Sequence, residues 1–410
     1  MGDEATELRH DLVERLRRQG YLTDDRVADA FGEVPRENFL PEYADRLGLA
    51  AVYRDEAIVT RRDPETRLPT SSSSQPAIMA RMLEMLDLRA GQRVVEIGAG
   101  TGYNAALLDR LVGPKGSVTS VELDREVAAR AREALLATRS AAAVVVGDGR
   151  AGAPDGERVD RIIVTASGEA VARAWYDQLV PGGVLVVPLR LSRVLFSAQV
   201  VVALRKVSSG FDTVAVSAGA FMALRGPSAT GGARPAQSAV DEHADTRVTR
   251  PLFHLTGPAL AGLDAAARQR LLVTALGFSR HRRVHLGDAS SWALASYAAL
   301  DLPEERLVEV VGGPRWMGPR EQALGVVDAA DGSLALLVGD GSSARVTGFG
   351  GPNAERALLG AVSRWHAAGR PATDEVTLRV RYGPERPHAW RTLRRGDHWI
   401  AVDWARPADS

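Results

Sequence analysis

The chain has 410 residues, with 51 basic and 51 acidic side chains and 45% hydrophobic residues. This length accommodates two domains, and the absence of net charge argues against nucleic acid or an anionic membrane surface as a partner. Because the chain has no cysteine, disulfides, thiolate metal sites and cysteine nucleophiles are excluded.

The N-terminal segment is charged and amphipathic, unlike a signal peptide, and no apolar run approaches the length of a membrane span. We therefore expect a cytoplasmic protein. Leucines at helical spacing predict a first helix that stops at Gly20, and a second helix should stop before Pro35.

Four consecutive serines, Ser71–Ser74, lead directly into an apolar segment. The apolar residues that follow recur at helical spacing and predict a helix with Pro76 in its first turn. Ser74 or Gln75 would be the N-cap, so the serines would lie beside free N–H groups, where an anion can bind. Taken alone, this pattern favours a capped helix after a polar loop over a binding pocket.

From residue 93 onward, short apolar runs alternate with helical segments. Strands are expected at 93–98, 117–123, 142–149, 159–167 and 182–189, and helices at 103–112, 125–137 and 169–180. This alternation predicts an α/β fold with a mostly parallel sheet and helices on both faces. Segments 197–207 and 213–224 could add antiparallel strands.

The stretch 226–239 is rich in Gly, Pro, Ala and Ser and is interpreted as a linker between a catalytic domain at 1–225 and a smaller α+β domain at 240–410. The second domain should contain a hairpin around Asp331-Gly332. Its basic cluster at 279–285 is interpreted as a solvated face, with contact to an acidic peptide as the alternative. His281 and His285 lack a third nearby ligand, so no metal site is predicted.

Three glycines, Gly98, Gly100 and Gly102, form a tight turn between a predicted strand and a predicted helix. Such a turn lets a ligand approach the backbone closely, although dinucleotide-binding folds use a similar loop. Glu122 ends the next strand, 20 residues after Gly102. At that spacing its carboxylate can accept both hydroxyls of a ribose.

The third strand ends in Gly147-Asp148-Gly149, which places a second acid where it can accept from an adenine amino group. A nicotinamide dinucleotide would require a third glycine at the position of Tyr103. The pattern therefore favours S-adenosylmethionine over a dinucleotide. The oxidoreductase reading stays open as the weaker alternative.

These motifs together resemble the S-adenosylmethionine-dependent methyltransferases with a Rossmann-like fold. Within that fold, the segments LVERLRRQGYL, DDRVADAFGEVPRENFLPEY and DRIIVTAS are similar to the protein-L-isoaspartate O-methyltransferase family. SSSQPAIMA stands at the place of the family's Thr-Ile-Ser-Gln-Pro motif. The resemblance covers roughly residues 8 to 200.

The resemblance implies that Ser74 contacts the substrate carboxylate, with Ser72 and Ser73 beside it, and so favours a polar pocket at the serines. It also implies a cofactor site formed by seven residues of the glycine turn and the strand ends. They are Glu96, Gly98, Gly100, Gly102, Glu122, Asp148 and Gly149.

The chain departs from the family in two places: Ser72-Ser73-Ser74 replaces Thr-Ile-Ser, and the segment 53–69 is longer than usual. Repair enzymes are also expected to lack a large C-terminal domain such as the region after residue 240. These differences resemble variants that methylate an aspartate in a ribosomally synthesised, modified peptide, such as a graspetide or lanthipeptide. The ester then closes to an aspartimide. The alternatives are general isoaspartate repair and an inactive peptide-recruiting module.

The expected chemistry needs no general base. A carboxylate with a pKa of about 4 is already ionised at neutral pH, and its attack on a methyl sulfonium merges opposite charges. Catalysis must then come from orientation and exclusion of water. Neutral hydroxyl donors can orient the carboxylate without lowering its nucleophilicity as an arginine would.

Overall fold

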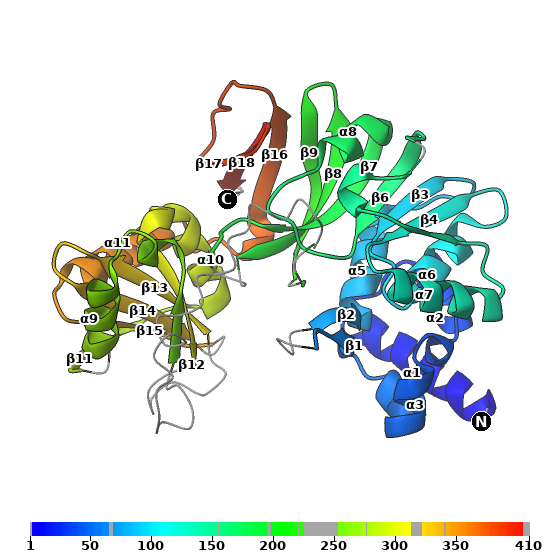
Figure 1. The fold of residues 1–410 in the computed structure, drawn as a ribbon, viewed down its shortest axis with the longest axis horizontal. Coiled ribbons are helices and arrows are strands. Elements are labelled where there is room, and N and C mark those ends of the chain that lie inside the picture. The colour runs from blue at the N-terminus through cyan, green and yellow to red at the C-terminus, as the bar shows by residue number, and fades with distance from the viewer. Residues whose placement is uncertain are drawn as a thin grey trace.

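The computed structural model describes residues 2–64, 69–154, 156–194, 198–219, 221–222, 224, 253–275, 277–312, 322–339 and 342–404. The linker expected at 226–239 lies outside these residues. The strands of the described chain form a ten-stranded sheet, a six-stranded sheet and, at the serines, a two-stranded hairpin. Figure 1 shows the two larger sheets side by side, with the N-terminal helices packed on the helices that cover one face of the ten-stranded sheet.

Both N-terminal helices predicted from sequence are present, and shorter helices follow them. The elements are α1 (Gly2–Arg18), α2 (Asp25–Glu33), η1 (Arg36–Phe39), α3 (Pro41–Leu47) and α4 (Leu49–Val52). The hairpin strands β1 (Ile58–Arg62) and β2 (Pro69–Ser73) come next, and then α5 (Pro76–Leu86). The hydrophobic faces of α1 and α2 pack into the same core as α5.

The central part of the large sheet confirms the predicted alternation. Its elements are β3 (Arg93–Ile97), α6 (Tyr103–Val112), β4 (Ser117–Glu122), α7 (Arg125–Ala137), β5 (Ala143–Val146), η2 (Gly149–Ala151), β6 (Val159–Val164), α8 (Arg173–Gln178), β7 (Leu179–Arg190), β8 (Gln199–Val207) and β9 (Gly210–Ala218). Strands β7, β6, β3, β4 and β5 are parallel neighbours, and β8 and β9 are antiparallel. The fold is a Rossmann-like α/β sheet. The predicted helix at 169–180 is shorter, because β7 already begins at Leu179.

Alternate residues along each strand point to opposite faces and enter separate cores. Val94 and Ile163 face the core that holds α5, α6 and α7. Val95 and Ile162 face the second core, which contains Trp175 of α8. The cofactor motifs sit where the parallel strands of this two-faced sheet end.

The chain after residue 252 first forms the smaller sheet. Its elements are β10 (Phe253–Thr256), η4 (Pro258–Leu260), α9 (Ala265–Ala275), β11 (Ser279–Val284), α10 (Ser291–Asp301), η5 (Glu304–Arg306), β12 (Leu307–Gly312), β13 (Gln322–Asp328), β14 (Ser333–Gly339), β15 (Ala344–Phe349) and α11 (Asn353–Ala367). The hairpin predicted around Asp331-Gly332 joins β13 to β14. The basic segment at 279–285 forms edge strand β11, where Arg280 and Arg282 form ion pairs with Glu355.

The last strands return to the large sheet. After η6 (Thr373–Glu375) come β16 (Val376–Tyr382), β17 (Arg391–Arg395) and β18 (His398–Trp404). Strand β16 pairs with β9, and Figure 1 shows all three strands continuing the sheet on that side. Apolar residues of β16 and β18 lie in the core of the larger sheet. The predicted domain boundary at residue 240 does not account for these strands joining the larger sheet, and the boundary stays a prediction. A chain cut near residue 225 would lose part of the larger core.

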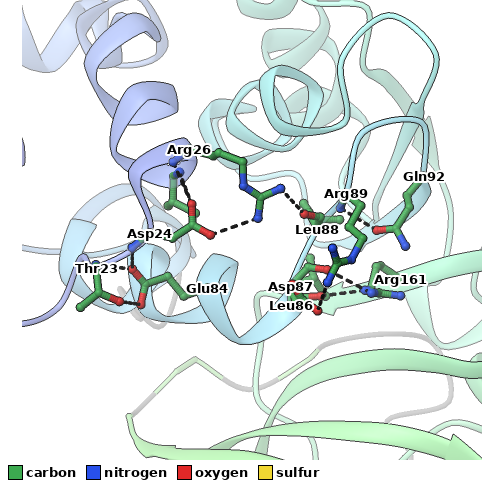
Figure 2. Close-up of polar contacts among 11 residues, drawn as sticks. Thr23, Asp24, Arg26, Glu84, Leu86, Asp87, Leu88, Arg89, Gln92 and Arg161 are labelled. Carbon is green, nitrogen blue, oxygen red and sulfur yellow. Dashed lines mark hydrogen bonds and ion pairs between the residues drawn. The ribbon is translucent and has the colours of Figure 1, made fainter.

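Helix α5, which follows the serines, is held at its C-terminal end by arginines (Figure 2). Arg161 donates to the carbonyls of Leu86 and Asp87, at 2.7 and 3.0 Å, and Arg26 donates to the Leu88 carbonyl at 2.7 Å. Cations at the C-terminal end interact favourably with the negative end of the helix dipole, and they donate to carbonyls that have no partner within the helix.

Glu84, on the same helix, binds the segment between α1 and α2. Its carboxylate accepts from the Thr23 hydroxyl at 3.0 Å and from the Asp24 backbone N–H at 2.8 Å, as Figure 2 shows. These contacts fix the N-terminal helices to the helix that borders the serines.

His398 joins the returning strand β18 to the segment between β6 and α8. It is 1% exposed, and its Nε2 accepts from the Val171 N–H at 3.2 Å while Nδ1 lies 3.0 Å from Asp397 Oδ1. Both contacts are satisfied by a neutral ring protonated on Nδ1. Burial lowers the pKa of His398, and nearby Asp397 opposes this only in part.

We expect this histidine to make folding acid-sensitive. The unfolded state binds its proton below a pKa of about 6.5, and the native state binds it only at lower pH. The stability that neutral His398 contributes to the fold is therefore fully present above a pH of about 6.5 and is lost as the pH falls from there toward the native pKa. Denaturant unfolding at about pH 7.5 and about pH 5.5 should give a smaller pH-dependent loss for His398→Gln than for the wild type. The exposed His10→Gln variant is the control, and an equal loss in all three proteins would contradict the assignment.

No helix within the described ranges is both long and apolar enough to cross a bilayer.

Candidate functional site

The four serines belong to a strand and its exit, not to a loop. Strand β2 pairs antiparallel with β1, with Ser72 opposite Val59 and Ser73 opposite Ile58. Ser71 and Ser73 are buried, and Ser72 and Ser74 are half-buried. The Ser73 hydroxyl has no hydrogen-bond partner among the described residues, whereas that of Ser71 accepts from Thr60 at 3.1 Å. The prediction of a polar loop is therefore wrong, because Ser71–Ser73 lie in a strand, although the serines do line a cavity.

The N-terminus of α5 is already occupied by a carboxylate from the chain itself. Gln75 is the N-cap, and Asp55 accepts from the Ala77 N–H at 2.8 Å and from the Gln75 side chain at 2.9 Å. The helix end is thus neutralised by Asp55, not left free for a substrate anion. Nothing local in the sequence indicated this contact, since Asp55 lies 22 residues before Ala77.

The glycine turn brings the serine strand against the end of β3. Gly98 has φ +100°, and a Cβ there would lie 2.4 Å from the Thr165 hydroxyl. Gly100 has φ +53°, and its Cβ would lie 3.1 Å from the Ser72 carbonyl oxygen. A side chain at Gly100 would therefore press on the serine strand, one at Gly98 would clash with Thr165, and either would strain the backbone. Gly102, the N-cap of α6, packs on α7 and lies outside the cavity lining.

Glu122 presents its carboxylate at the end of β4, as predicted. Oε2 accepts from the Gly100 N–H and Oε1 from the Asp124 N–H, both at 3.1 Å. The side chain is buried and lines the cavity. It connects the glycine turn to the start of α7, and its remaining lone pairs can accept hydroxyl groups.

Glu96 lies in the same wall, but its oxygens are both engaged. Asn104 Nδ2 donates to Oε1 at 2.7 Å, and the Ser120 hydroxyl donates to Oε2. Complete burial raises the pKa of Glu96 to about 7, although both hydrogen bonds oppose this rise. Glu96 therefore joins β3 to α6 and β4 and is suited to positioning the turn.

Asp148 is not brought into the cavity. Its carboxylate caps η2 through the Arg150 N–H and forms an ion pair with the Arg150 guanidinium at 2.7 Å. The hydrogen bond from Arg150 is the main cause that lowers the pKa of Asp148. Gly149 does line the cavity. The adenine contact predicted for Asp148 stays a prediction that would require the Arg150 pair to rearrange.

One cavity of about 250 Å³ unites most of the predicted site. Eight of the ten predicted residues line it; Gly102 and Asp148 do not. The eight are Ser72, Ser73, Ser74, Glu96, Gly98, Gly100, Glu122 and Gly149. The described lining contains carboxylates and hydroxyls but no arginine, lysine or histidine. Such a surface can accept a ligand that carries a positive charge and hydroxyl groups.

Arg36 was not predicted from the sequence. It is completely buried, and its guanidinium donates to the carbonyls of Val52 and Ser74, each at 3.1 Å. It also lies over the Tyr103 ring, 5.0 Å from the ring centroid. Burial lowers the pKa of this side chain. Arg36 therefore fixes the backbone of Ser74 from beneath.

Arg61 ties the serine hairpin to the cofactor side of the cavity. It forms ion pairs with Asp124 at 2.8 Å and Glu126 at 3.0 Å, at the start of α7. Because the Asp124 N–H also donates to Glu122, these contacts connect β1 to the end of β4.

His281 and His285 are far from this site in sequence, and no metal-binding group of three His, Cys, Asp or Glu occurs in the described part of the chain.

Residues 7–224 match the family model described as protein-L-isoaspartate(D-aspartate) O-methyltransferase. This is more than half of the chain. The chain belongs to this family. Its members are S-adenosylmethionine-dependent carboxyl methyltransferases, so the chain is an enzyme of that class and S-adenosylmethionine is its methyl donor.

Named relatives agree with the family over the N-terminal half. A protein-L-isoaspartate O-methyltransferase of Thermotoga maritima is 42% identical over 174 residues, which is 42% of this chain and 52% of the relative. The chain thus matches about half the length of that protein. One of Ignicoccus hospitalis is 38% identical over 187 residues, 45% of this chain and 82% of the relative.

A solved structure corrects our expectation about the C-terminal region. A chain titled protein-L-isoaspartate O-methyltransferase is similar over 97% of this chain and 99% of its own, with a TM-score of 0.51 and 24% identity. The fold with a second sheet therefore also occurs under that name. The region after residue 240 is no argument for peptide maturation, and the family membership leaves the dinucleotide reading without support.

Proposed function

We propose that this methyltransferase acts as a general repair enzyme, methylating the free α-carboxylate of L-isoaspartyl residues in damaged proteins. The observation that carries the proposal is the placement of the serine strand against the glycine turn in one cavity. An acceptor held by the serines would lie next to a donor held by the turn. The family and its named relatives support the same reaction.

The residues of the cavity fit S-adenosylmethionine. Gly98 and Gly100 line the cavity without side chains, and the Glu122 carboxylate in the same wall can accept ribose hydroxyls. The lining carries carboxylates but no described basic side chain, which suits a sulfonium. When bound, this cofactor supplies an electrophilic methyl group.

The serines are suited to orienting the acceptor. Ser72 and Ser74 are half-buried, and Ser73 contributes a buried hydroxyl without a described partner. Hydroxyls bind a carboxylate through neutral hydrogen bonds and leave a lone pair free to attack. Because the acceptor is already ionised at neutral pH, no residue need remove a proton. The protein's contribution is alignment and removal of water.

The product would then react on its own. In an isoaspartyl methyl ester, the backbone nitrogen of the following residue attacks the ester carbonyl, methanol leaves, and a succinimide forms. Hydrolysis of the imide returns aspartate or isoaspartate. None of these steps requires a further side chain of the enzyme.

The proposal is tested with a matched pair of peptides that differ only in one aspartyl linkage. Mass spectrometry after incubation with S-adenosylmethionine should show a gain of about 14 Da, or a loss of about 18 Da after ring closure, for the isoaspartyl peptide alone. Equal modification of both peptides would overturn repair specificity. No modification of either peptide would support an inactive module.

Ser74→Ala should lower kcat for the isoaspartyl peptide by about 10- to 100-fold, because the lost hydrogen bond is made to the reacting group. Affinity for S-adenosylmethionine should change little. Stability should also change little, since Gln75 and not Ser74 is the N-cap of α5. Steady-state kinetics and calorimetric titration measure these effects separately.

Thr60→Ala is the matched control, because it removes a hydroxyl from the same hairpin but outside the cofactor cavity. It should retain near wild-type turnover. If folded Ser74→Ala enzyme were as active as this control, Ser74 would not orient the acceptor.

A further inference from the structure

A second cavity lies beside the serines and shares part of its lining with the cofactor cavity. Its volume is about 490 Å³. Ser72, Ser74, Thr165, Phe221 and Met222 line both cavities, so the two adjoin at the proposed acceptor position. A peptide whose carboxylate reaches the serines would have its neighbouring residues in this second cavity.

Three parts of the chain form most of the walls that the cofactor cavity does not share. Tyr21, 45% exposed, follows α1, and Ser217 with Ala218 lies at the end of β9. The third wall is the face of α5 that carries Ile78 and Arg81, three residues apart and therefore on one side of the helix. The walls thus offer apolar and hydroxyl surface with one cationic group.

Arg81 is the only charged residue among those described in this cavity, and it is half-buried. Other arginines around α5 are engaged: Arg36, Arg26 and Arg161 all bind backbone carbonyls. Arg81 makes no hydrogen bond or ion pair with any part of the chain that the structure describes. A partly buried guanidinium without a partner is complementary to a carboxylate, which it can bind through two parallel hydrogen bonds.

We infer that Arg81 selects substrates with an acidic side chain near the isoaspartyl residue. This inference rests on the proposed function and adds a sequence preference to it. Helix α5 begins at Pro76, two residues after Ser74, and rises by about 8 Å from Pro76 to Arg81, which two or three residues of an extended peptide also span. The acidic residue should therefore stand two or three positions from the isoaspartate.

The test compares isoaspartyl peptides that differ only in Glu or Gln at these positions on either side. Wild-type enzyme should methylate one Glu peptide with a kcat/KM about 3- to 10-fold above its Gln partner, mainly through KM. In Arg81→Gln the Glu and Gln peptides should have equal kcat/KM. Arg81→Glu should instead prefer a peptide with Lys at the same position over its Gln partner. The wild-type ratio should also shrink as salt is raised.

Arg89→Gln is the control of equal charge change, since Arg89 is exposed and lies outside the cavity. It should keep the wild-type preference. Equal kcat/KM for all Glu and Gln pairs in the wild type, with the isoaspartyl linkage still required, would overturn the inference alone. A preference that persists in Arg81→Gln would also overturn it. No methylation of any isoaspartyl peptide would overturn the proposed function with it.

Discussion

Glu122→Ala is expected to weaken S-adenosylmethionine binding about 10- to 150-fold, which corresponds to the loss of about 1.5–3 kcal/mol from charged hydrogen bonds. The carboxylate both faces the cavity and accepts from the Gly100 N–H, so its removal takes away a ligand acceptor and loosens the turn. Titration calorimetry on folded protein measures the effect.

Two further variants sharpen this test. Glu122→Gln keeps the shape and one acceptor oxygen and should fall between the wild type and alanine. Glu126→Ala removes a carboxylate close in sequence that is exposed and pairs with Arg61 at 3.0 Å. Its affinity should stay near that of the wild type. Unchanged affinity in folded Glu122→Ala would remove Glu122 from the cofactor site.

Arg36→Ala is expected to lower the free energy of unfolding by about 3–5 kcal/mol. The change leaves the Val52 and Ser74 carbonyls without their donor and opens a cavity beneath the serines. Relief of the buried charge offsets part of this loss, since burial already disfavours the charged guanidinium. Denaturant unfolding with a fixed m-value gives the difference.

Arg36→Met separates the causes, because it refills most of the volume but provides no donor. If it recovers only part of the stability and still has reduced kcat, Arg36 positions Ser74 through its hydrogen bond. Arg26→Ala, which removes a more exposed arginine that also binds a carbonyl, should cost under about 1 kcal/mol. Equal losses in Arg36→Ala and Arg26→Ala would contradict the assignment.

Local sequence patterns determined the order and type of most elements. The apolar runs around β3, β4 and β6 and the helical spacing of α6 and α7 agree with the structure, because periodicity records which face of each element is buried. The glycine turn and Glu122 were also predictable. In a parallel sheet, the carboxyl ends of neighbouring strands necessarily meet at one edge.

Contacts between distant segments were decided only by the tertiary structure. The carboxylate at the start of α5 comes from Asp55, the donor beneath Ser74 from Arg36, and the neighbours of β9 include a strand more than 150 residues later. Likewise, spacing placed Asp148 at a strand end but could not show its pair with Arg150. Periodicity reports burial but not the partner. Partners are chosen by packing and charge once the whole chain has folded.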